Sequence, residues 1–296
     1  MTTLLTGATG LTGTLFLKRL AEIMPNTKIY CLVRETSDRS KIAHLNLKLN
    51  YYKGDSKIPE TWDQIFDQNN FETIIHLVQL NQVPTILNSL KKVRQTPHLI
   101  IIGTTGIYSK YNRYSQEYKD AEKELFHYSG TYCLIRPTMI YGSSQDQNLH
   151  KLIKFCHRYR FFPVFGSGNT LLQPIHADDV AQALLKAWQF PSIQGAYDLS
   201  GASIVTFREL LNIVSKLLAK PVYSLYFSFS IGITMATLLE GFLREKSPVR
   251  REQILRLQED KVYSHELAKK DLDFLPRTLE IGLQQEIELM RNQGII

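Results

Sequence analysis

Short apolar runs alternate along the chain with longer segments in which apolar residues recur every three or four positions. The apolar runs lie at residues 2–6, 28–33, 49–56, 73–79, 98–108, 131–142 and 195–201. Helical patterns separate them, and the first of these is the run at 15–20. Buried strands alternating with helices are typical of an α/β protein with a parallel sheet covered on both faces. The pattern therefore predicts a doubly wound parallel sheet.

The first strand runs directly into a turn with three glycines, Gly7, Gly10 and Gly13. Gly7 can adopt backbone angles that a side chain forbids, and Gly10 leaves room for a diphosphate at the positive end of the following helix. Gly13 would let that helix lie close on the sheet. The spacing differs from the G-x-G-x-x-G dinucleotide fingerprint by one residue in its first interval. The strand before the turn and the helix after it nevertheless favour a Rossmann-type cofactor site over a turn without a ligand.

This stretch resembles the short-chain dehydrogenase/reductase superfamily, in particular its extended and atypical branch, often labelled NAD-dependent epimerase/dehydratase. Arg136-Pro137 and the run from His176 to Val180 carry the same resemblance. We expect an NAD(P)-binding Rossmann domain at residues 1–200 and a smaller C-terminal substrate lobe at 201–296, with 143–172 partly contributing to the substrate side. The expected cofactor-binding residues are Gly7, Thr9, Gly10, Leu11, Gly13, Arg34, Asp55, Ser56, Val78, Pro137, Thr138 and Ile140.

The end of the second strand bears on the choice of cofactor. It carries Arg34, where an NAD-specific Rossmann protein usually has an acidic residue for the ribose hydroxyl. With Ser37, Arg39 and Lys41 close behind, the loop could hold a 2′-phosphate, so NADP is favoured over NAD. An exposed basic loop is the alternative. In the family, an acid placed like Asp55 accepts a hydrogen bond from the adenine amino group, and the backbone just after Pro137 meets the nicotinamide amide.

The exit of the fifth strand resembles the family's strand that ends in Ser-Ser-Thr-Gly-Val-Tyr. That alignment places Thr104 at the hydroxyl that hydrogen-bonds the substrate's reacting oxygen, and Thr105 is one residue away. A Tyr-x-x-x-Lys pair should follow, in which the lysine lowers the pKa of the phenol so that it can exchange a proton. No tyrosine in this sequence is followed four residues later by lysine.

Setting Ala121-Glu122 on the family's helix places Tyr114 at the catalytic tyrosine and Tyr118 where lysine belongs. Lys119 is displaced by one residue, about 100° around a helix. Three interpretations stay open. Tyr114 and Lys119 form a distorted pair, Tyr111 acts as the tyrosine from the loop, or the site binds cofactor without the standard chemistry.

Residues 223–243 are rich in Phe, Ile, Leu and Met and almost uncharged until Glu240. The run approaches the roughly 20 apolar residues that a membrane span needs, but serines, threonines and glycines dilute it. We expect a buried or lid helix over an apolar substrate, with a helix resting on a membrane surface as the less favoured alternative. The segment 143–165 is expected to be helical, and 165–169 to form a turn.

Two polar patterns in the chain are interpreted as structural. His76 is a lone histidine in an apolar strand, which is more often a core residue than a base. His176, Asp178 and Asp179 look like a metal cluster, but an Asp before a run rich in Ala, Val and Leu is an ordinary helix N-cap, so no metal is expected.

Composition narrows the class of protein. Among the 296 residues, 44% are apolar and 21% are charged, which is usual for a globular enzyme. The net charge of +7 comes without a Lys/Arg block, so a diffusely basic surface is expected and no nucleic-acid partner. The three cysteines lack C-x-x-C spacing and the first strand begins at residue 2, which together predict a cytoplasmic location. A homodimer stays open.

The sequence thus predicts an NADP-linked oxidoreductase or epimerase that acts on a hydroxyl or keto group of a small-molecule substrate. Thr104 would hold the reacting oxygen, Tyr114 would exchange its proton, and Lys119 would supply positive charge. By resemblance, a nucleotide-linked sugar is the first substrate class, while 223–243 argues for a lipid-like one. The alternative is a catalytically altered NAD(P)-binding protein that acts as a redox sensor or assembly factor.

Overall fold

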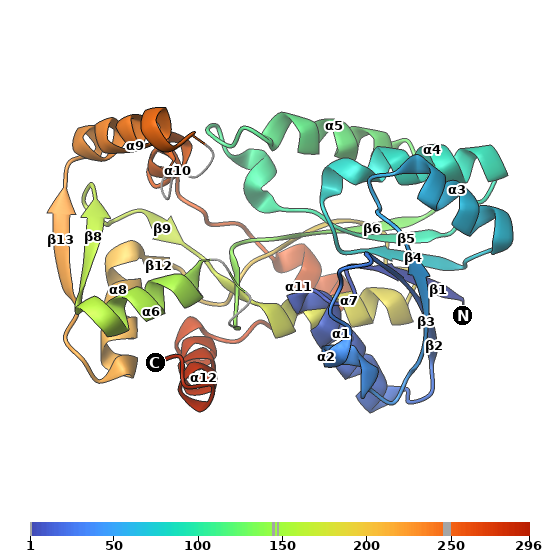
Figure 1. Ribbon diagram of the computed structural model, residues 1–296, viewed down its shortest axis with the longest axis horizontal. Coiled ribbons are helices and arrows are strands. Elements are labelled where there is room, and N and C mark those ends of the chain that lie inside the picture. Colours follow the sequence, from blue (N-terminus) through green and yellow to red (C-terminus); the bar gives the residue numbers. More distant parts are fainter. Residues whose placement is uncertain (1, 144–145, 147, 245–249) are drawn as a thin grey trace.

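The computed structural model describes residues 2–143, 146, 148–244 and 250–296 (Figure 1). Its main sheet has seven parallel strands in the order β11-β6-β5-β4-β1-β2-β3. The strands are β1 (Thr3–Thr6), β2 (Lys28–Val33), β3 (Lys48–Lys53), β4 (Thr73–His76), β5 (His98–Ile102), β6 (Tyr132–Pro137) and β11 (Gly195–Leu199). The strand order reverses between β1 and β4, which is where ligands bind in open sheets of this kind. The predicted Rossmann-type fold is confirmed.

Helices cover both faces of this sheet, which explains why its central strands are apolar on both sides. One face carries α1 (Leu11–Ile23), α2 (Ser40–Ala43) and α7 (Ala177–Gln189), which pack on Leu5, Cys31 and Ile100. The other carries α3 (Pro59–Gln68), α4 (Val83–Val93) and α5 (Ser115–Phe126), which pack on Leu4, Ile74 and Leu99. Two short 3-10 helices, η1 (Leu80–Gln82) and η2 (Thr105–Tyr108), follow β4 and β5.

A smaller lobe has its own apolar core, built mainly from three helices (Figure 1). These are α6 (Leu149–Tyr159), α8 (Phe207–Leu218) and α12 (Leu279–Asn292). Three two-stranded sheets join β8 (Phe161–Phe165) to β13 (Tyr223–Phe227), β9 (Leu171–Leu172) to β12 (Val205–Thr206), and β7 (Ile140–Tyr141) to β10 (Ile175–His176). Helices α9 (Phe229–Leu243) and α10 (Arg251–Arg256) lie beside β13 and β8.

One helix of the C-terminal segment lies outside this lobe. α11 (Glu266–Leu272) packs against α7 and β11, and its residues Ala268 and Leu272 belong to the core of the seven-stranded sheet. The expectation that all of 201–296 forms the smaller lobe is therefore wrong for α11. The helix returns to the sheet because its small apolar face fits against α7, a contact that local sequence does not reveal.

Two expectations about the lobe also need correction. The segment 143–165 is not helical throughout, because α6 ends where Arg160 takes a left-handed conformation (φ 63°) and β8 follows, pairing with β13 some 60 residues later. The segment 223–243 is not a buried helix: it forms β13 and then α9, and most of its large apolar side chains are exposed. In contrast, the turn expected at 165–169 is present, with Gly166 and Gly168 at positive φ.

Within the described ranges, the structure has no helix that is long and apolar enough to cross a membrane.

Candidate cofactor and active site

The glycine turn after β1 is packed so tightly that side chains are excluded from it. Gly7 has φ +75°, and a Cβ there would lie 2.9 Å from the carbonyl oxygen of Leu77. A Cβ on Gly13 would lie 2.2 Å from the carbonyl oxygen of Gly7. Gly10 donates its N–H to the same oxygen at 3.0 Å. These contacts hold the start of α1 directly against the end of β1, as the spacing of the glycines predicts.

The turn presents a free helix end to its surroundings. Gly10 is the exposed N-cap of α1 and offers no side chain to the first N–H groups, and the first turn contains no acidic residue. Thr9 and Leu11 flank it, both half-buried. Early N–H groups of a helix lack carbonyl partners and carry partial positive charge. A phosphate could therefore reach them without displacing a side chain, so the residues present fit a dinucleotide.

The loop after β2 is basic and accessible. Arg34 is exposed, and its backbone N–H donates to the Ser37 hydroxyl at 3.1 Å. Its guanidinium has no hydrogen-bond or ion-pair partner among the described residues. The guanidinium of Arg39 lies 5.0 Å from the centre of the Tyr51 ring. Two cations thus stand beside the end of β2, where the sequence predicts them.

The loops after β3 and β4 complete this end of the site. The carboxylate of Asp55 accepts from the backbone N–H of Lys57 at 3.0 Å, which shapes the turn. The Ser56 hydroxyl donates to the Gln82 side chain at 2.7 Å, so its hydrogen is already engaged within the protein. Val78 is half-buried and follows Leu77, whose carbonyl backs Gly7.

The segment after β6 is bonded mainly to the protein itself. Pro137 ends the strand, and Thr138 donates its N–H to Leu199 at 2.8 Å and its hydroxyl to the carbonyl of Gln173 at 2.6 Å. Ile140 pairs with Ile175 in the next small sheet. Both hydrogen-bond donors of Thr138 are thus used internally, so a contact with nicotinamide at 138–140 would come from the remaining backbone.

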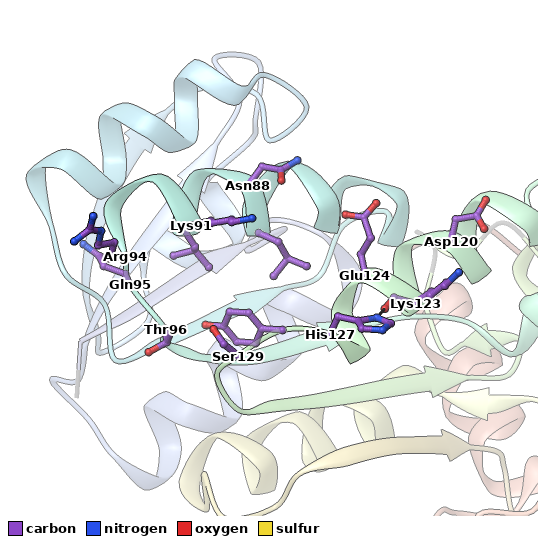
Figure 2. A pocket seen from close by; sticks show the side chains of 13 residues that line it. Asn88, Lys91, Arg94, Gln95, Thr96, Asp120, Lys123, Glu124, His127 and Ser129 are labelled. Carbon is purple, nitrogen blue, oxygen red and sulfur yellow. Dashed lines mark hydrogen bonds between the residues drawn. The ribbon is translucent and has the colours of Figure 1, made fainter.

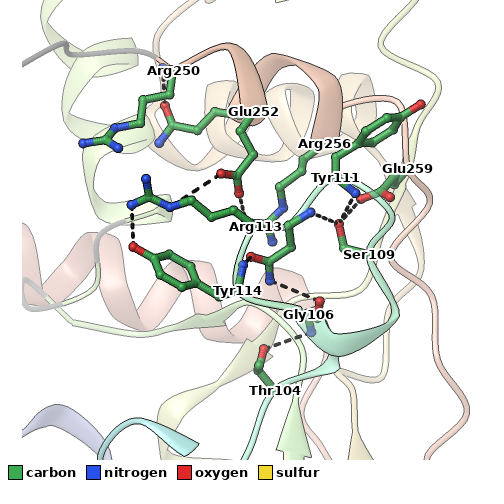
Figure 3. Close-up of polar contacts among 12 residues, drawn as sticks. Thr104, Gly106, Ser109, Tyr111, Arg113, Tyr114, Arg250, Glu252, Arg256 and Glu259 are labelled. Atoms are coloured by element: carbon green, nitrogen blue, oxygen red, sulfur yellow. Dashed lines mark hydrogen bonds and ion pairs between the residues drawn. The ribbon is translucent and has the colours of Figure 1, made fainter. Parts of the chain in front are cut away.

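The two threonines after β5 have different environments. The Thr105 side chain is buried and donates to the carbonyl of Pro137 at 3.3 Å. Thr104 is less buried, and its oxygen accepts from the N–H of Gly106 at 3.0 Å, which caps η2 (Figure 3). Because that contact uses only its oxygen as acceptor, the Thr104 hydroxyl hydrogen is left for another partner.

Arginine, not lysine, provides the cation beside Tyr114. The Arg113 guanidinium donates to the Tyr114 oxygen and lies 4.5 Å from the centre of its ring (Figure 3). Arg113 is also 3.9 Å from the carboxylate of Glu252 on α10. Lys119 is exposed and forms no hydrogen bond with Tyr114 in the described part of the chain. The expected Tyr114–Lys119 pair is therefore not formed, because five residues on a helix point the two side chains in different directions.

Two other tyrosines near Tyr114 in the sequence are Tyr118 and Tyr111. Tyr118 stacks on Tyr114 with ring centres 6.2 Å apart, at the position where the family pattern has lysine. Tyr111 is 40% exposed, and Figure 3 shows its hydroxyl pointing away from Thr104. Tyr114 is equally exposed, at 40%, and differs from Tyr111 in that its oxygen accepts a hydrogen bond from a cation, the Arg113 guanidinium.

A buried ion pair fixes the segment that carries Thr104 and Tyr114. The Arg136 guanidinium binds the Glu122 carboxylate through two contacts, at 2.8 and 2.5 Å, and lies 3.5 Å from Asp198. The Tyr108 hydroxyl donates to Asp198 at 3.0 Å. Burial and the Asp198 carboxylate raise the pKa of Tyr108 to about 12, although Arg136 opposes them, so this phenol stays protonated. The sequence indicated Arg136 only through the family resemblance. It did not predict the network of Arg136 with Glu122, Asp198 and Tyr108.

An apolar cavity of about 540 Å³ lies between α6, β8, α8 and α10. Its lining includes Phe155, Phe162, Phe207 and Ile254, together with the amine of Lys261. Burial lowers the pKa of Lys261 to about 8, and its amine has no acceptor among the described residues. α10 contributes Ile254 to this cavity and Glu252 to the contact with Arg113, so one helix separates the cavity from Tyr114. No sequence motif marks Lys261.

A second cavity of about 850 Å³ lies between the C-terminal halves of α4 and α5 (Figure 2). Its lining is charged, with Lys91 and Arg94 from α4 and its end, and Asp120, Lys123 and Glu124 from α5. None of the residues expected to bind cofactor or substrate lines it. This cavity is therefore separate from the candidate site.

The acidic pair near the start of α7 holds three parts of the chain together. Asp178 binds Arg19 of α1 at 2.6 and 2.7 Å and Arg277 at 2.6 Å, and Asp179 accepts from Arg277 at 2.9 Å. Burial opposes ionisation of Asp178, but the hydrogen bonds from Arg19 and Arg277 outweigh it and hold the pKa at about 2. The N-cap of α7 is His176, whose Nδ1 accepts from the backbone N–H of Asp178, so the expected Asp N-cap is wrong.

His76 is a core residue with both ring nitrogens engaged. Its Nδ1 lies 2.9 Å from the Thr6 hydroxyl and its Nε2 lies 3.2 Å from the carbonyl oxygen of Gln79. Since a carbonyl only accepts, Nε2 carries the hydrogen and Nδ1 accepts from Thr6. Burial lowers the pKa of His76 from 6.5 to about 4.

We expect the protein to lose stability as the pH falls from 6.5 to 4. The unfolded chain protonates His76 near pH 6.5, whereas the folded chain takes that proton only near pH 4, so acid favours unfolding. The loss from His76 is at most about 3.5 kcal/mol, since one pKa unit is worth about 1.4 kcal/mol. His176 is also expected to reduce stability at low pH, because burial and the neighbouring Arg277 lower its pKa to about 4.

Urea unfolding at a series of pH values measures this loss of stability. His76→Gln should flatten the dependence, while the exposed His127→Gln should leave it unchanged.

The fold and the glycine turn together are those of the Rossmann class of α/β proteins. A family model for an NAD-binding domain, described as male sterility protein, matches residues 5–66. The chain is 28% identical over 172 residues to NADH dehydrogenase (ubiquinone) 1 alpha subcomplex subunit 9, mitochondrial, of Arabidopsis thaliana, covering 54% of this chain and 42% of that protein. It is 24% identical over 176 residues to short-chain dehydrogenase/reductase family 42E member 1 of Mus musculus, covering 55% and 44%. The matches thus span less than half the length of either relative.

Solved structures share the fold along the whole chain. UDP-glucose 4-epimerase of Thermotoga maritima superposes with a TM-score of 0.76 at 17% identity, covering 99% of this chain and 100% of that one. The dTDP-glucose 4,6-dehydratase of Bacillus anthracis, in complex with NAD, gives 0.74 at 15% identity, covering 100% of both chains. Together, the sequence and structure comparisons confirm the resemblance to an extended branch of the short-chain dehydrogenase/reductase superfamily.

Proposed function

We propose that this protein is an NAD(P)-dependent oxidoreductase or epimerase that acts on a hydroxyl or keto group. The observation that carries the proposal is the placement of the candidate residues on one edge of the sheet. The glycine turn follows β1, Arg34 follows β2, and Thr104 follows β5. Carboxyl ends of parallel strands meet at one edge, where the strand order reverses beside β1. The similarity of residues 5–66 to an NAD-binding domain supports the same site.

The chain's own residues have distinct proposed roles. NAD(P), when bound, supplies hydride transfer. Thr104 donates its free hydroxyl hydrogen to the reacting oxygen of the substrate, and Tyr114 exchanges a proton with that oxygen. Arg113 takes the place proposed for Lys119, because its guanidinium contacts the Tyr114 oxygen and stabilises negative charge there during the exchange.

The cavity beside α10 supports a lipid-like substrate over a nucleotide-linked sugar. Aromatic and aliphatic side chains form most of its wall, and a sugar would leave its hydroxyls without partners there. Lys261 is the cation that could bind an oxygen of such a substrate. The structures that share the fold include enzymes of nucleotide-linked sugars, so both classes belong in a substrate screen.

We expect Arg34→Ala to weaken NADPH binding about tenfold and to leave NADH binding unchanged, because one charge-assisted hydrogen bond to the 2′-phosphate would be lost. Fluorescence titration of both nucleotides measures the change. Lys28→Ala is the matched control, since it removes the same charge at the other end of β2. An equal effect on both nucleotides, or none, would mean that Arg34 belongs only to an exposed basic loop and that NADP is not preferred.

A second function is a dinucleotide-binding protein without turnover, acting as a redox sensor or assembly factor. Two observations favour it: Tyr118 stands where the family pattern has lysine, and a relative is named as a subunit of mitochondrial NADH dehydrogenase. The similarity to this relative covers only part of the chain. A role of this protein as a subunit of a larger complex is therefore a proposal.

Loss of NADPH absorbance with apolar ketones, together with chromatographic detection of epimers formed from nucleotide-linked sugars, separates the two functions. Turnover of any compound that depends on Tyr114 supports the enzyme. Saturable nucleotide binding with no turnover across the screen supports the sensor or assembly factor.

A further inference from the structure

Helix α9 is composed mainly of apolar residues but is not buried. Only one of its 15 residues, Glu240, is charged. A helix of that composition in a globular protein is normally covered on all sides. Here Gly232 and Ala236 are buried, whereas Met235 is 52%, Leu238 56% and Phe242 85% exposed. The described part of the chain therefore leaves an apolar surface without a cover.

The exposed side chains lie together. Ile231, Met235, Leu238 and Phe242 follow a spacing of four, three and four residues, which places them along one side of the helix. β13 precedes α9 and adds Tyr223, Leu225 and Phe227, which share one face of the strand and are 65%, 44% and 39% exposed. Figure 1 shows β13 and α9 at the end of the smaller lobe that is farthest from the seven-stranded sheet. We call this surface the α9 face.

Basic residues border the α9 face. Arg244 follows the last helical residue of α9, and Arg250 and Arg251 open α10, which packs against α9. Arg244 and Arg251 are exposed. The acidic residue of α10, Glu252, lies near Arg113 and Arg256, so its charge is compensated within the protein. An apolar surface bordered by cations is complementary to a lipid layer with anionic head groups.

We propose that the α9 face docks on the surface of a membrane that contains anionic lipid. The side of α9 with Met235, Leu238 and Phe242 enters the boundary between head groups and acyl chains. Arg244 and Arg251 contact the lipid phosphates. The helix lies in the surface and does not cross it, because 15 residues extend only about 22 Å against a hydrocarbon thickness of about 30 Å. Tyr223 suits the head-group layer, where amphipathic rings are enriched.

The apolar cavity lies directly behind this face. β8 lines the cavity through Phe162 and Phe165 and pairs with β13, and the Phe165 ring packs against Gly232 of α9, so close that a Cβ there would lie 2.6 Å from it. Docking would bring the cavity next to the lipid layer, from which an apolar substrate could enter. This link rests on the proposed function, whereas docking itself does not.

Flotation with lipid vesicles tests the docking. We expect the protein to bind vesicles of phosphatidylcholine with phosphatidylglycerol, and to bind phosphatidylcholine alone more weakly. Leu238→Asp and Phe242→Asp should each lower binding about tenfold, because an apolar contact becomes a buried charge. Ile281→Asp on α12 is the matched control and should bind as the wild type does, since Ile281 is 51% exposed but lies away from the α9 face. The double variant Arg244→Glu, Arg251→Glu should lose most of the preference for anionic vesicles.

Two results would overturn the docking. One is an absence of vesicle binding by the wild type, or binding that Leu238→Asp does not change. The other is a dimer, detected by light scattering, that Leu238→Asp dissociates, together with no binding to vesicles. That result would make the α9 face a contact between two copies of the chain. Circular dichroism of every variant ensures that lost binding is not lost folding. Nucleotide titration of Leu238→Asp should match the wild type, which keeps this test separate from that of the cofactor site.

Discussion

Gly13→Ala is expected to abolish dinucleotide binding and to destabilise the protein by about 3 kcal/mol, the upper part of the usual cost of overpacking. The added Cβ would lie 2.2 Å from the carbonyl oxygen of Gly7 and 2.9 Å from its carbon. Both atoms belong to the backbone, so no side chain can rotate away, and α1 must move off β1. That movement displaces the N-terminus of the helix from the place where the diphosphate would bind. Urea unfolding and NADPH titration measure the two effects.

Gly241→Ala is the matched control for this substitution. Gly241 also lies in a helix, α9, but a Cβ there would have no atom within 4 Å. The same change should therefore raise stability by up to about 1 kcal/mol through helix propensity and leave nucleotide binding alone. If Gly13→Ala bound NADPH as tightly as the wild type, the glycine turn would not be the cofactor site.

Tyr114→Phe is expected to lower turnover by about 10²- to 10⁴-fold, the range usual for loss of a proton-transfer group. Cofactor affinity should stay the same, because the substitution removes only the hydroxyl. Arg113→Met should also lower turnover, since the Tyr114 oxygen would lose the cation that contacts it. Steady-state rates at saturating NADPH, with a substrate found in the screen, measure these effects.

Two variants serve as controls for Tyr114. Lys119→Met should leave turnover unchanged, because Lys119 makes no hydrogen bond to Tyr114 in the described part of the chain. Tyr111→Phe should also act like the wild type. A large loss in Lys119→Met together with a normal Arg113→Met would restore the lysine pair that the sequence predicts. A large loss in Tyr111→Phe with a normal Tyr114→Phe would move the proton-transfer role to the loop.

The sheet and the glycine turn were predictable from sequence because both depend on local patterns. Strands such as β2 show an uninterrupted apolar run, here at 29–33, and the steric demands of Gly7 and Gly13 appear as their spacing. His76 was also predictable as a core residue, since a lone histidine in an apolar strand has little access to solvent.

The parts that could not be predicted depend on contacts distant in sequence. β8 forms because β13, some 60 residues later, pairs with it. The Arg113 contact with Tyr114 depends on side-chain direction at the start of α5, whereas alignment to a family pattern pointed to Lys119. The exposure of α9 cannot be derived from its composition, which is that of a buried helix.

Fluorescence titration of the wild-type protein with NADPH and NADH tests most directly whether this edge of the sheet binds a dinucleotide. We predict saturable binding of both, tighter for NADPH because Arg34 and Arg39 follow β2, in the loop that we propose binds a 2′-phosphate. Absence of binding for both nucleotides would contradict the account. It would rule out both proposed functions, the NAD(P)-dependent enzyme and the dinucleotide-binding sensor or assembly factor.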